Sequence, residues 1–367
     1  MPEISFEELY TQGKILFNPE EPEQSILVIR EKLGTYPEYH KFRIEEMLLG
    51  HDANKAHSVP KENGPWYSPK EGHEYWNSYF SLTEKKTKQW VKEEKDALGI
   101  LQSLDINTTK IVNHLFNPQL QGDQSRYGLV IGHVQSGKTA NYTGLIAKAA
   151  DCGYNLIVVL TGLYNDLRHQ TQVRIEKELT GTFSDAKGFS VDGRNYKIPW
   201  RILTRTGPKG DFFNGYPRKN ENYHEPLKIE DLSSPTILLM KKNVTPLTRL
   251  NEWLASIDAN VIENLNVLIV DDESDHASVN TMTGRNEESS HTGEHSENKI
   301  NGEIRKMLQQ FNRFSYVGYT ATPFANIFIN PDNDGLGLGP TLYPRDFIVS
   351  LPRPTGYFGL STAFSEC

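Results

Sequence analysis

One octapeptide in the middle of the chain has the residue types and spacing that bind phosphate groups. It reads, in order, Gly132, His133, Val134, Gln135, Ser136, Gly137, Lys138 and Thr139. The glycines allow a turn whose backbone N–H groups point at phosphate oxygens, and the helix that follows adds the positive end of its dipole. In this pattern the lysine contacts the β- and γ-phosphates, and the threonine hydroxyl binds Mg²⁺. The octapeptide therefore predicts a site for a nucleoside triphosphate; the alternative is a glycine-rich turn with an exposed lysine.

A cluster of acidic residues follows an apolar run near residue 270. The run Val267–Val270 ends in Asp271, Asp272, Glu273, Ser274 and Asp275. Asp272 is expected to hold Mg²⁺ through water, opposite Thr139, and Glu273 to accept a proton from the attacking water. Asp271 lies one residue before the position at which this pattern places the metal-side acid, and it is the alternative for that role. The structural alternative is an acidic loop after a buried strand.

A strand-like segment with hydroxyl residues at its end is the third candidate. It reads Tyr316-Val317-Gly318-Tyr319-Thr320-Ala321-Thr322-Pro323. In nucleic-acid motors such a segment lies beside the acidic strand, and its hydroxyls bond to the acidic motif and report the nucleotide state. Thr320 and Thr322 are the residues predicted to do this here. A strand that simply ends at a proline is the alternative.

Three basic residues lie where motors place contacts to a nucleic-acid backbone. Arg168 comes after the run Leu156–Leu160, and Lys241 and Lys242 come after another apolar run. Each is a candidate contact to a phosphate backbone, and a solvated surface is the alternative for each. His291 and His295 have metal-like spacing but no acidic or cysteine partner, which indicates a loop rather than a metal site.

The elements that must position these residues are those of an α/β fold. Short apolar runs lie at 128–131, 156–160, 202–203, 237–240, 267–270 and 316–317. Amphipathic stretches between them lie near 138–151, 163–179, 245–264 and 300–312. Continuous apolar strands separated by helices favour a parallel sheet covered on both faces. Residues 126–330 are therefore expected to form a RecA-like phosphate-loop lobe, with the parallel sheet flanked by helices.

The flanking segments have a different composition. Residues 1–125 are expected to form a mostly helical accessory region, in which apolar residues recur at helical spacing from Glu74 to Leu104. Asp105 or Asn107 is predicted to cap a further helix. The polar stretch 283–299 is expected to be a mobile loop. The Gly- and Pro-rich tail, 331–367, contains the apolar run Phe347–Leu351 but little else for a core, and is expected to begin the next domain.

Composition excludes several classes of protein. The chain has 367 residues and a net charge of −8, which excludes a globally basic nucleic-acid binder. Its 2 cysteines, Cys152 and Cys367, do not make a disulfide framework, so a reducing cytoplasm is the default. The N-terminal residues lack the pattern of a signal peptide, and no apolar stretch of about 18 residues predicts a membrane span.

Three segments together resemble the helicase-like part of bacterial proteins that carry the Z1 endonuclease domain. These are the octapeptide continued by Ala140, the acidic cluster, and the turn Gly318 to Pro323 continued by Phe324, Ala325 and Asn326. The resemblance spans roughly residues 74–330 and implies a superfamily-two helicase-like ATPase, associated with DNA modification, restriction and phage defence. It implies ATP and Mg²⁺ as cofactors, Lys138 and Glu273 as catalytic residues, and Thr139 and Asp272 as metal-side residues. Thr320 and Thr322 would couple the site to movement.

The pattern departs from such motors after Pro323. Motors of this class need a second lobe that supplies an arginine to the γ-phosphate, and too few residues follow for a lobe of about 100–150 residues. The chain is therefore expected to be the N-terminal piece of a longer protein, with any nuclease role mainly beyond it. An arginine finger contributes about 10³–10⁵ in rate, so hydrolysis by this chain alone is expected to be slow.

DNA and proteins of a restriction or defence system are the partners that the resemblance implies, through the full-length protein and without a membrane. A non-catalytic, nucleotide-gated interaction module is the alternative function. A GTPase or small-molecule kinase is less favoured, because no N-K-x-D guanine motif follows the acidic strand.

Overall fold

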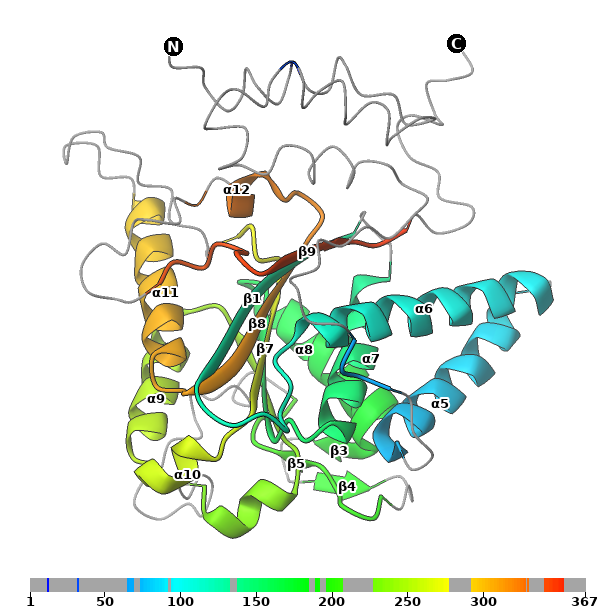
Figure 1. Ribbon diagram of the computed structural model, residues 1–367, viewed down its shortest axis with the longest axis horizontal. Coiled ribbons are helices and arrows are strands. Elements are labelled where there is room, and N and C mark those ends of the chain that lie inside the picture. Colours follow the sequence, from blue (N-terminus) through cyan, green and yellow to red (C-terminus); the bar gives the residue numbers. More distant parts are fainter. Residues whose placement is uncertain are drawn as a thin grey trace.

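A seven-stranded sheet organises the chain (Figure 1). The computed structural model describes residues 65–68, 73–91, 94–132, 137–184, 189–191, 196–206, 227–276, 292–327 and 340–352, with residues 12, 32 and 329. The strand order is β5-β6-β2-β7-β8-β1-β9, and all neighbours are parallel. The strands are β1 (Gln124–Ile131), β2 (Leu156–Thr161), β5 (Arg201–Ile202), β6 (Thr236–Lys241), β7 (Val267–Asp272), β8 (Arg313–Thr320) and β9 (Phe347–Ser350). Strands β3 (Thr182–Ser184) and β4 (Phe189–Val191) form a separate antiparallel pair.

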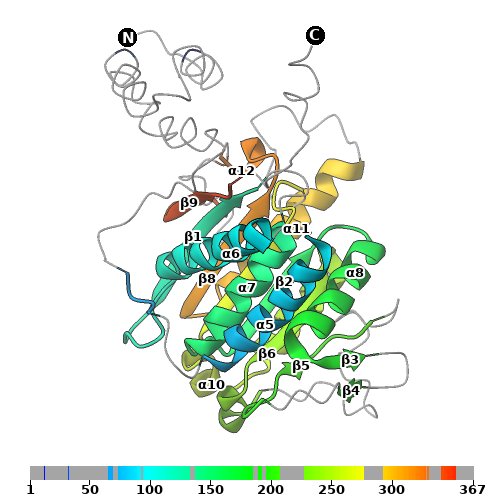
Figure 2. The same ribbon diagram turned by 90° about the vertical axis from the view of Figure 1, so that its right-hand side faces the viewer.

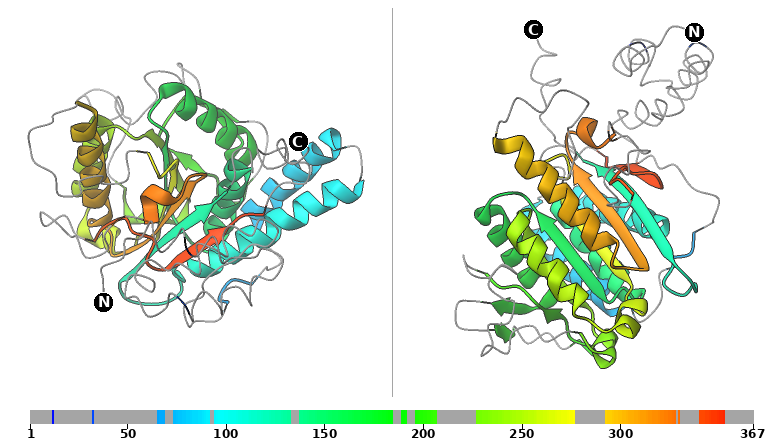
Figure 3. Two further views of the ribbon diagram at one scale, coloured as in Figure 1. Left: turned by 90° about the horizontal axis from the view of Figure 1, so that it is seen from above. Right: turned by 90° about the vertical axis from the view of Figure 1, so that its left-hand side faces the viewer.

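Helices cover both faces of this sheet. The α-helices are α5 (Glu74–Trp90), α6 (Glu94–His114), α7 (Lys138–Asp151), α8 (Asn165–Ile175), α9 (Val244–Ala255), α10 (Ala259–Glu263), α11 (Thr292–Leu308) and α12 (Phe324–Ile327). A π-helical turn, η1 (Glu176–Thr180), continues α8, and a 3₁₀ turn, η3 (Ile229–Ser233), precedes β6. Figure 2 shows α5 to α8 in front of the sheet, and the right view of Figure 3 shows α9 and α11 on the opposite side.

The burial of β2 shows why its sequence is apolar without interruption. Ile157 and Val159 belong to the core beneath α5 to α8, whereas Val158 and Leu160 belong to the core beneath α9 to α11. Successive side chains of a strand point to opposite faces, so a sheet covered twice needs apolar residues at every position. The predicted α/β fold class, a parallel sheet flanked by helices, is confirmed.

The accessory helices α5 and α6 dock on α7 through buried polar contacts. The Lys148 Nζ of α7 donates to Asp105 Oδ1 at 2.6 Å and lies 3.9 Å from the centre of the Trp76 ring. Burial lowers the pKa of Lys148 to about 8. The Asp151 carboxylate accepts from the backbone N–H groups of Tyr75 (3.1 Å) and Trp76 (2.8 Å), so it caps the start of α5. The pair α5–α6 is thereby fixed to the helix that follows the octapeptide.

Two helix boundaries differ from the sequence prediction. Helix α6 passes through Asp105 and Asn107 without a break, so neither residue caps a further helix. Their polar groups have partners elsewhere, because Asn107 Nδ2 donates to Ser103 Oγ at 3.1 Å within the helix and Asp105 binds Lys148. Helix α11 begins at Thr292, so the last part of the predicted loop 283–299 is helical; residues 277–291 lie outside the described residues.

The tail contributes a strand to the same sheet, so the domain boundary predicted at residue 330 does not separate it. Strand β9 pairs with β1 over Gly128–Ile131. Gly128 is needed there, since a Cβ at this position would lie 2.0 Å from the Phe347 ring. Asp346 Oδ2 accepts from Tyr127 N–H at 2.8 Å, and Leu351 N–H donates to Ile131 O at 2.7 Å. The apolar run 347–351 therefore belongs to the core of this sheet and not to the core of a separate domain.

Candidate functional site

The octapeptide joins β1 to α7, as the phosphate-loop pattern requires. Gly132 N–H continues the ladder from β1 by donating to Thr320 O at 2.9 Å. Gly137 has a φ of 80°, in the left-handed region that favours glycine, and α7 begins at the next residue. Lys138 Nζ folds back over the turn and donates to Gly132 O at 3.1 Å. The other four loop residues, His133, Val134, Gln135 and Ser136, lie outside the described residues.

The electrostatic surroundings of Lys138 link it to the acidic strand end. Burial lowers the pKa of Lys138, and the nearby carboxylates of Asp272, Asp275 and Glu273 oppose that shift. The Lys138 ammonium group is thus partly desolvated and lies near three carboxylates. The loop lysine and the acidic cluster, separated widely in sequence, therefore meet at the carboxyl edge of the sheet.

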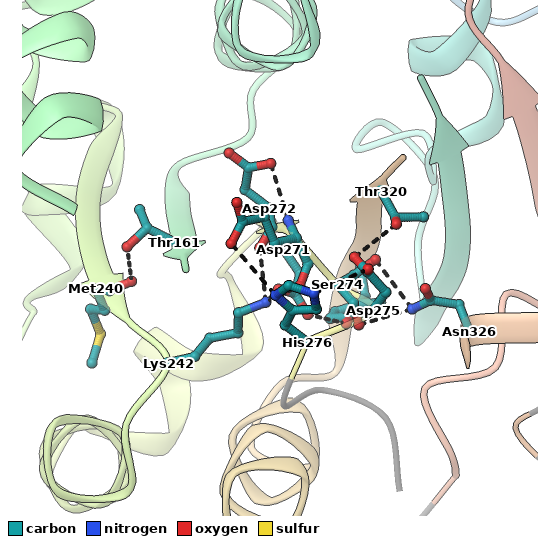
Figure 4. Close-up of polar contacts among 12 residues, drawn as sticks. Thr161, Met240, Lys242, Asp271, Asp272, Ser274, Asp275, His276, Thr320 and Asn326 are labelled. Atoms are coloured by element: carbon teal, nitrogen blue, oxygen red, sulfur yellow. Dashed lines mark hydrogen bonds and ion pairs between the residues drawn. The ribbon is translucent and has the colours of Figure 1, made fainter. Parts of the chain in front are cut away.

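The acidic strand end separates two aspartates with different roles. Asp271 is fully buried and lies 3.0 Å from Lys242 Nζ (Figure 4). Its other oxygen accepts from the Tyr316 hydroxyl. Asp272 points to the other face, where Tyr142 O–H donates to its Oδ2 at 3.2 Å. Burial, aided by the charge of Glu273, raises the pKa of Asp272. Asp272 is thus the carboxylate available to a metal, and the alternative assignment to Asp271 does not fit its burial.

Glu273 has a backbone conformation that is unusual for a residue other than glycine. Its φ is 53°, in the left-handed region, which costs about 1 kcal/mol or more. The chain turns there directly after β7, so the side chain leaves the sheet toward Gly162, at the end of β2. A Cβ on Gly162 would lie 2.6 Å from Glu273 Oε2, so the absence of a side chain at Gly162 makes room for the carboxylate.

The hydroxyl turn after β8 is bonded to the last acidic residue. Thr320 Oγ1 donates to Asp275 Oδ1 at 2.7 Å (Figure 4). The Thr322 hydroxyl donates to Asp275 Oδ2. Asn326 Nδ2 donates to the backbone oxygen of Ser274 at 3.0 Å. Because β8 lies between β7 and β1, this turn sits between the acidic cluster and the phosphate loop. The predicted bonds between the hydroxyls and the acidic motif are present; their coupling to movement stays a prediction.

These groups line one cavity of about 490 Å³. Its walls come from the start of α7, the end of β2, one face of α8, the acidic cluster and the turn after β8: Lys138, Thr139, Gly162, Leu167, Gln170, Thr171, Arg174, Asp272, Glu273, Asp275, His276, Thr320, Ala321 and Thr322. The Tyr142 hydroxyl, bonded to Asp272, also interacts with Thr139 and Thr171. Thr139 and Asp272 therefore line the same cavity and share Tyr142 as a hydrogen-bonding partner.

Several residues of the cavity were not predicted from the sequence. Gln170, Thr171 and Arg174 have the spacing i, i+1 and i+4, which places them on one face of a helix. That face of α8 is turned to the cavity, and Arg174 adds a second positive charge opposite the acidic cluster. The spacing was visible in the sequence, but α8 is polar almost all round, so it did not indicate which face is turned inward.

The predicted nucleic-acid contacts do not all lie on the surface. Arg168 is 1% exposed and donates to Arg205 O at 3.0 Å, and Lys242 is 1% exposed beneath the acidic strand. Neither side chain is placed to contact a nucleic-acid backbone in this structure, because each is held inside by its partners. Lys241 is partly exposed and donates to Asn165 Oδ1 at 3.0 Å, so its contact stays a prediction.

The side chains of His291 and His295 lie outside what the structure describes, so the prediction of a loop rather than a metal site stays a prediction. His291 lies outside the described residues, and only the backbone of His295 is described, in α11. In the part of the chain that the structure describes, His, Cys, Asp and Glu side chains form no group of three or more that could hold a metal by themselves. A metal at the cavity would therefore depend on the phosphates as well as on Thr139 and Asp272.

Comparisons with known proteins do not add a family. No family model and no curated protein matches the chain. Among solved structures, FtsY from Mycoplasma mycoides is 12% identical over 77% of this chain and 94% of that chain, with a TM-score of 0.22. Similarity of this size carries no functional argument. Within the described residues, none of the helices has the length and apolar character needed to cross a membrane.

Proposed function

We propose that the chain binds ATP with Mg²⁺ in the cavity of about 490 Å³ and hydrolyses it, as the first lobe of a helicase-like motor. The observation that carries the proposal is that Lys138 and Thr139 share this cavity with Asp272 and Glu273. A phosphate-loop lysine, a metal-side threonine and an acidic pair are the groups that phosphoryl transfer to water requires.

Each residue has a defined task in the proposed reaction. Lys138 and the loop N–H groups would hold the β- and γ-phosphates, and Thr139 and Asp272 would hold Mg²⁺, which would neutralise phosphate charge. Glu273 accepts a proton from the water that attacks the γ-phosphorus. The bond between that phosphorus and the bridging oxygen breaks, so ADP and inorganic phosphate leave. Burial of the cavity floor strengthens these electrostatic interactions.

Binding is tested first, by calorimetry with ATP and Mg²⁺. Lys138→Ala should weaken binding by about tenfold or more, because a charged hydrogen bond to phosphate is lost. Lys177→Ala is the matched control, since Lys177 is an exposed lysine outside the cavity and should bind ATP as the wild type does. Equal affinity of the wild type and Lys138→Ala would refute the assigned site. GTP in place of ATP tests the nucleotide preference.

Hydrolysis is tested separately from binding. Glu273→Gln should keep ATP affinity within about threefold but lower the turnover rate by about 10²–10⁴, the contribution typical of a general base. A turnover rate unchanged by this substitution would remove Glu273 from the mechanism.

The DNA-directed role in restriction or phage defence is the finer part of the proposal. It is supported by the order and form of the three motifs, which resemble those of Z1-domain proteins. ATP turnover with and without single-stranded and duplex DNA tests it, and stimulation is expected to be small for this chain alone. RNA that stimulates more strongly than either form of DNA would redirect the proposal.

A nucleotide-gated interaction module is the second candidate function. It is favoured by the apolar surface of the pair α5–α6, where Trp90, Leu98 and Ile106 are 86%, 54% and 65% exposed. Such a module would bind ATP and release it slowly without turnover. Multiple turnovers by the purified chain, abolished by Glu273→Gln, would exclude it.

A further inference from the structure

A second, larger cavity is lined by Gly137 of the octapeptide and by none of the residues of the acidic cluster. Its volume is about 650 Å³, and it occupies the space between α5, α6 and the first turn of α7. Gly137, Ala140 and Asn141 form its wall at α7, and Leu351 and Pro352 border it from the end of β9. The pair α5–α6 that encloses it projects from the sheet in Figure 1 and in the left view of Figure 3.

The two cavities meet at the start of α7. Gly137, which lines the larger cavity, directly precedes Lys138 and Thr139, which line the phosphate cavity. Arg174 lines both cavities, and its guanidinium is bonded to Glu178 at 3.1 Å, which in turn binds Lys86 of α5 at 3.0 Å. The larger cavity therefore begins one residue before Lys138 in the chain and shares Arg174 with the phosphate cavity.

The chemistry of the larger cavity suits a planar aromatic group. Trp90, at its rim, is 86% exposed, and Ile100 is 42% exposed, so a large ring and an aliphatic side chain border open space. Ser103 and Asn107, which also line the cavity, carry hydrogen-bonding groups on α6. A volume of about 650 Å³ lies in the range of small-molecule sites, which combine apolar walls with a few polar groups.

We propose that this cavity receives the base and ribose of the nucleotide whose phosphates bind at Lys138. The inference rests on the proposed function and adds where the nucleoside end lies: against α6, at the aromatic rim formed by Trp90. The accessory helices would then be part of the nucleotide site, and their docking on α7 through Lys148 and Asp151 would keep the two cavities aligned.

The experiment compares ATP with methyl triphosphate, which has the same charge but lacks base and ribose, by calorimetry in the presence of Mg²⁺. Base–aromatic stacking corresponds to about 5- to 150-fold in affinity. Wild-type protein should therefore bind ATP at least about fivefold more tightly than methyl triphosphate. Trp90→Ala should reduce that preference, and Trp90→Phe, which keeps a ring, should preserve most of it.

A blocking variant tests the cavity itself. Ser103→Trp should lower ATP affinity by about tenfold and leave methyl triphosphate affinity unchanged, with Ser103→Ala as the control that keeps the cavity open. Equal binding of the two ligands by the wild type, or an equal loss of both in Ser103→Trp, would overturn the inference while leaving the phosphate site intact. Methyl triphosphate binding that is absent or indifferent to Lys138→Ala would overturn the proposed function and the inference with it.

Discussion

The buried ion pair beneath the acidic strand gives the sharpest prediction about stability. The side chains of Lys242 and Asp271 are both 0% exposed, with Nζ and Oδ1 3.0 Å apart. Lys242 Nζ also donates to the backbone oxygens of Asp272, at 2.8 Å, and of Glu273. One ammonium group therefore holds three consecutive residues of the acidic cluster and fixes the turn that presents Asp272 and Glu273.

Replacing either partner leaves the other charge buried without compensation. Lys242→Met and Asp271→Leu should each destabilise the protein by about 3–5 kcal/mol. The double variant removes both charges and leaves backbone oxygens and the Tyr316 hydroxyl short of partners, at about 1–3 kcal/mol each. The double variant should therefore lose about as much stability as one single variant, rather than the sum of both losses. The difference corresponds to a coupling free energy of roughly 3 kcal/mol between the two sites.

Urea denaturation of the wild type, both single variants and the double variant, followed by circular dichroism, measures this coupling. Lys241→Met is the matched control: it alters the neighbouring lysine, whose bond to Asn165 lies at the surface, and should change stability by less than about 0.5 kcal/mol. Losses that simply add in the double variant, or a loss below about 1 kcal/mol for Lys242→Met, would refute the reasoning.

Three further predictions follow from contacts at the site and in the core. Gly162→Ala would place a Cβ 2.6 Å from Glu273 Oε2. The variant should still bind ATP, but its turnover rate should fall by about tenfold or more, because the carboxylate is displaced. A normal turnover rate would show that the position of this carboxylate is unimportant. Gly128→Ala would place a Cβ 2.0 Å from the Phe347 ring and should destabilise by about 1–3 kcal/mol in urea, whereas wild-type stability would contradict the observed packing of β9. Burial, with Lys110 nearby, lowers the pKa of His114 from 6.5 to about 4. Because the unfolded chain takes up the proton at a higher pH than the folded protein, the free energy of unfolding should fall as the pH drops from 6.5 to 4. In His114→Phe, the difference in stability between pH 7 and pH 5 should become smaller, and an unchanged difference would exclude His114 as its source.

The parts of the site that could be predicted from the sequence are those in which local chemistry and strand position agree. The octapeptide between an apolar run and a helix predicts a phosphate loop wherever the sheet lies, since the loop is built from its own backbone. The acidic cluster follows another continuous apolar run, and the carboxyl ends of parallel strands share one edge of the sheet. Lys138 and Asp272 could thus be placed together before the fold was known.

The parts that could not be predicted depend on contacts made across the fold. Lys and Arg usually lie at the surface of a protein, so the burial of Lys242 and Arg168 was not expected. Lys242 is held inside by acceptors at the end of β7, and Arg168 by an acceptor in the segment after β5. Gly162 makes room for a carboxylate that comes from a distant strand, and Arg174 reaches the cavity only because of how α8 is rotated on β2. The edge strand β9 was missed because its apolar run is short and stands alone in a Gly- and Pro-rich segment.

Strand β9 also gives the phosphate loop a mechanical connection. It runs parallel to β1. At its end, Ser350 pairs with Ile131 and Leu351 N–H donates to Ile131 O, immediately before Gly132. Tension applied to the chain after Pro352 would pull β9 along its own axis. Several of its hydrogen bonds to β1 would then bear the force together rather than one after another. A load on that segment would thus be transmitted to the backbone that precedes Gly132.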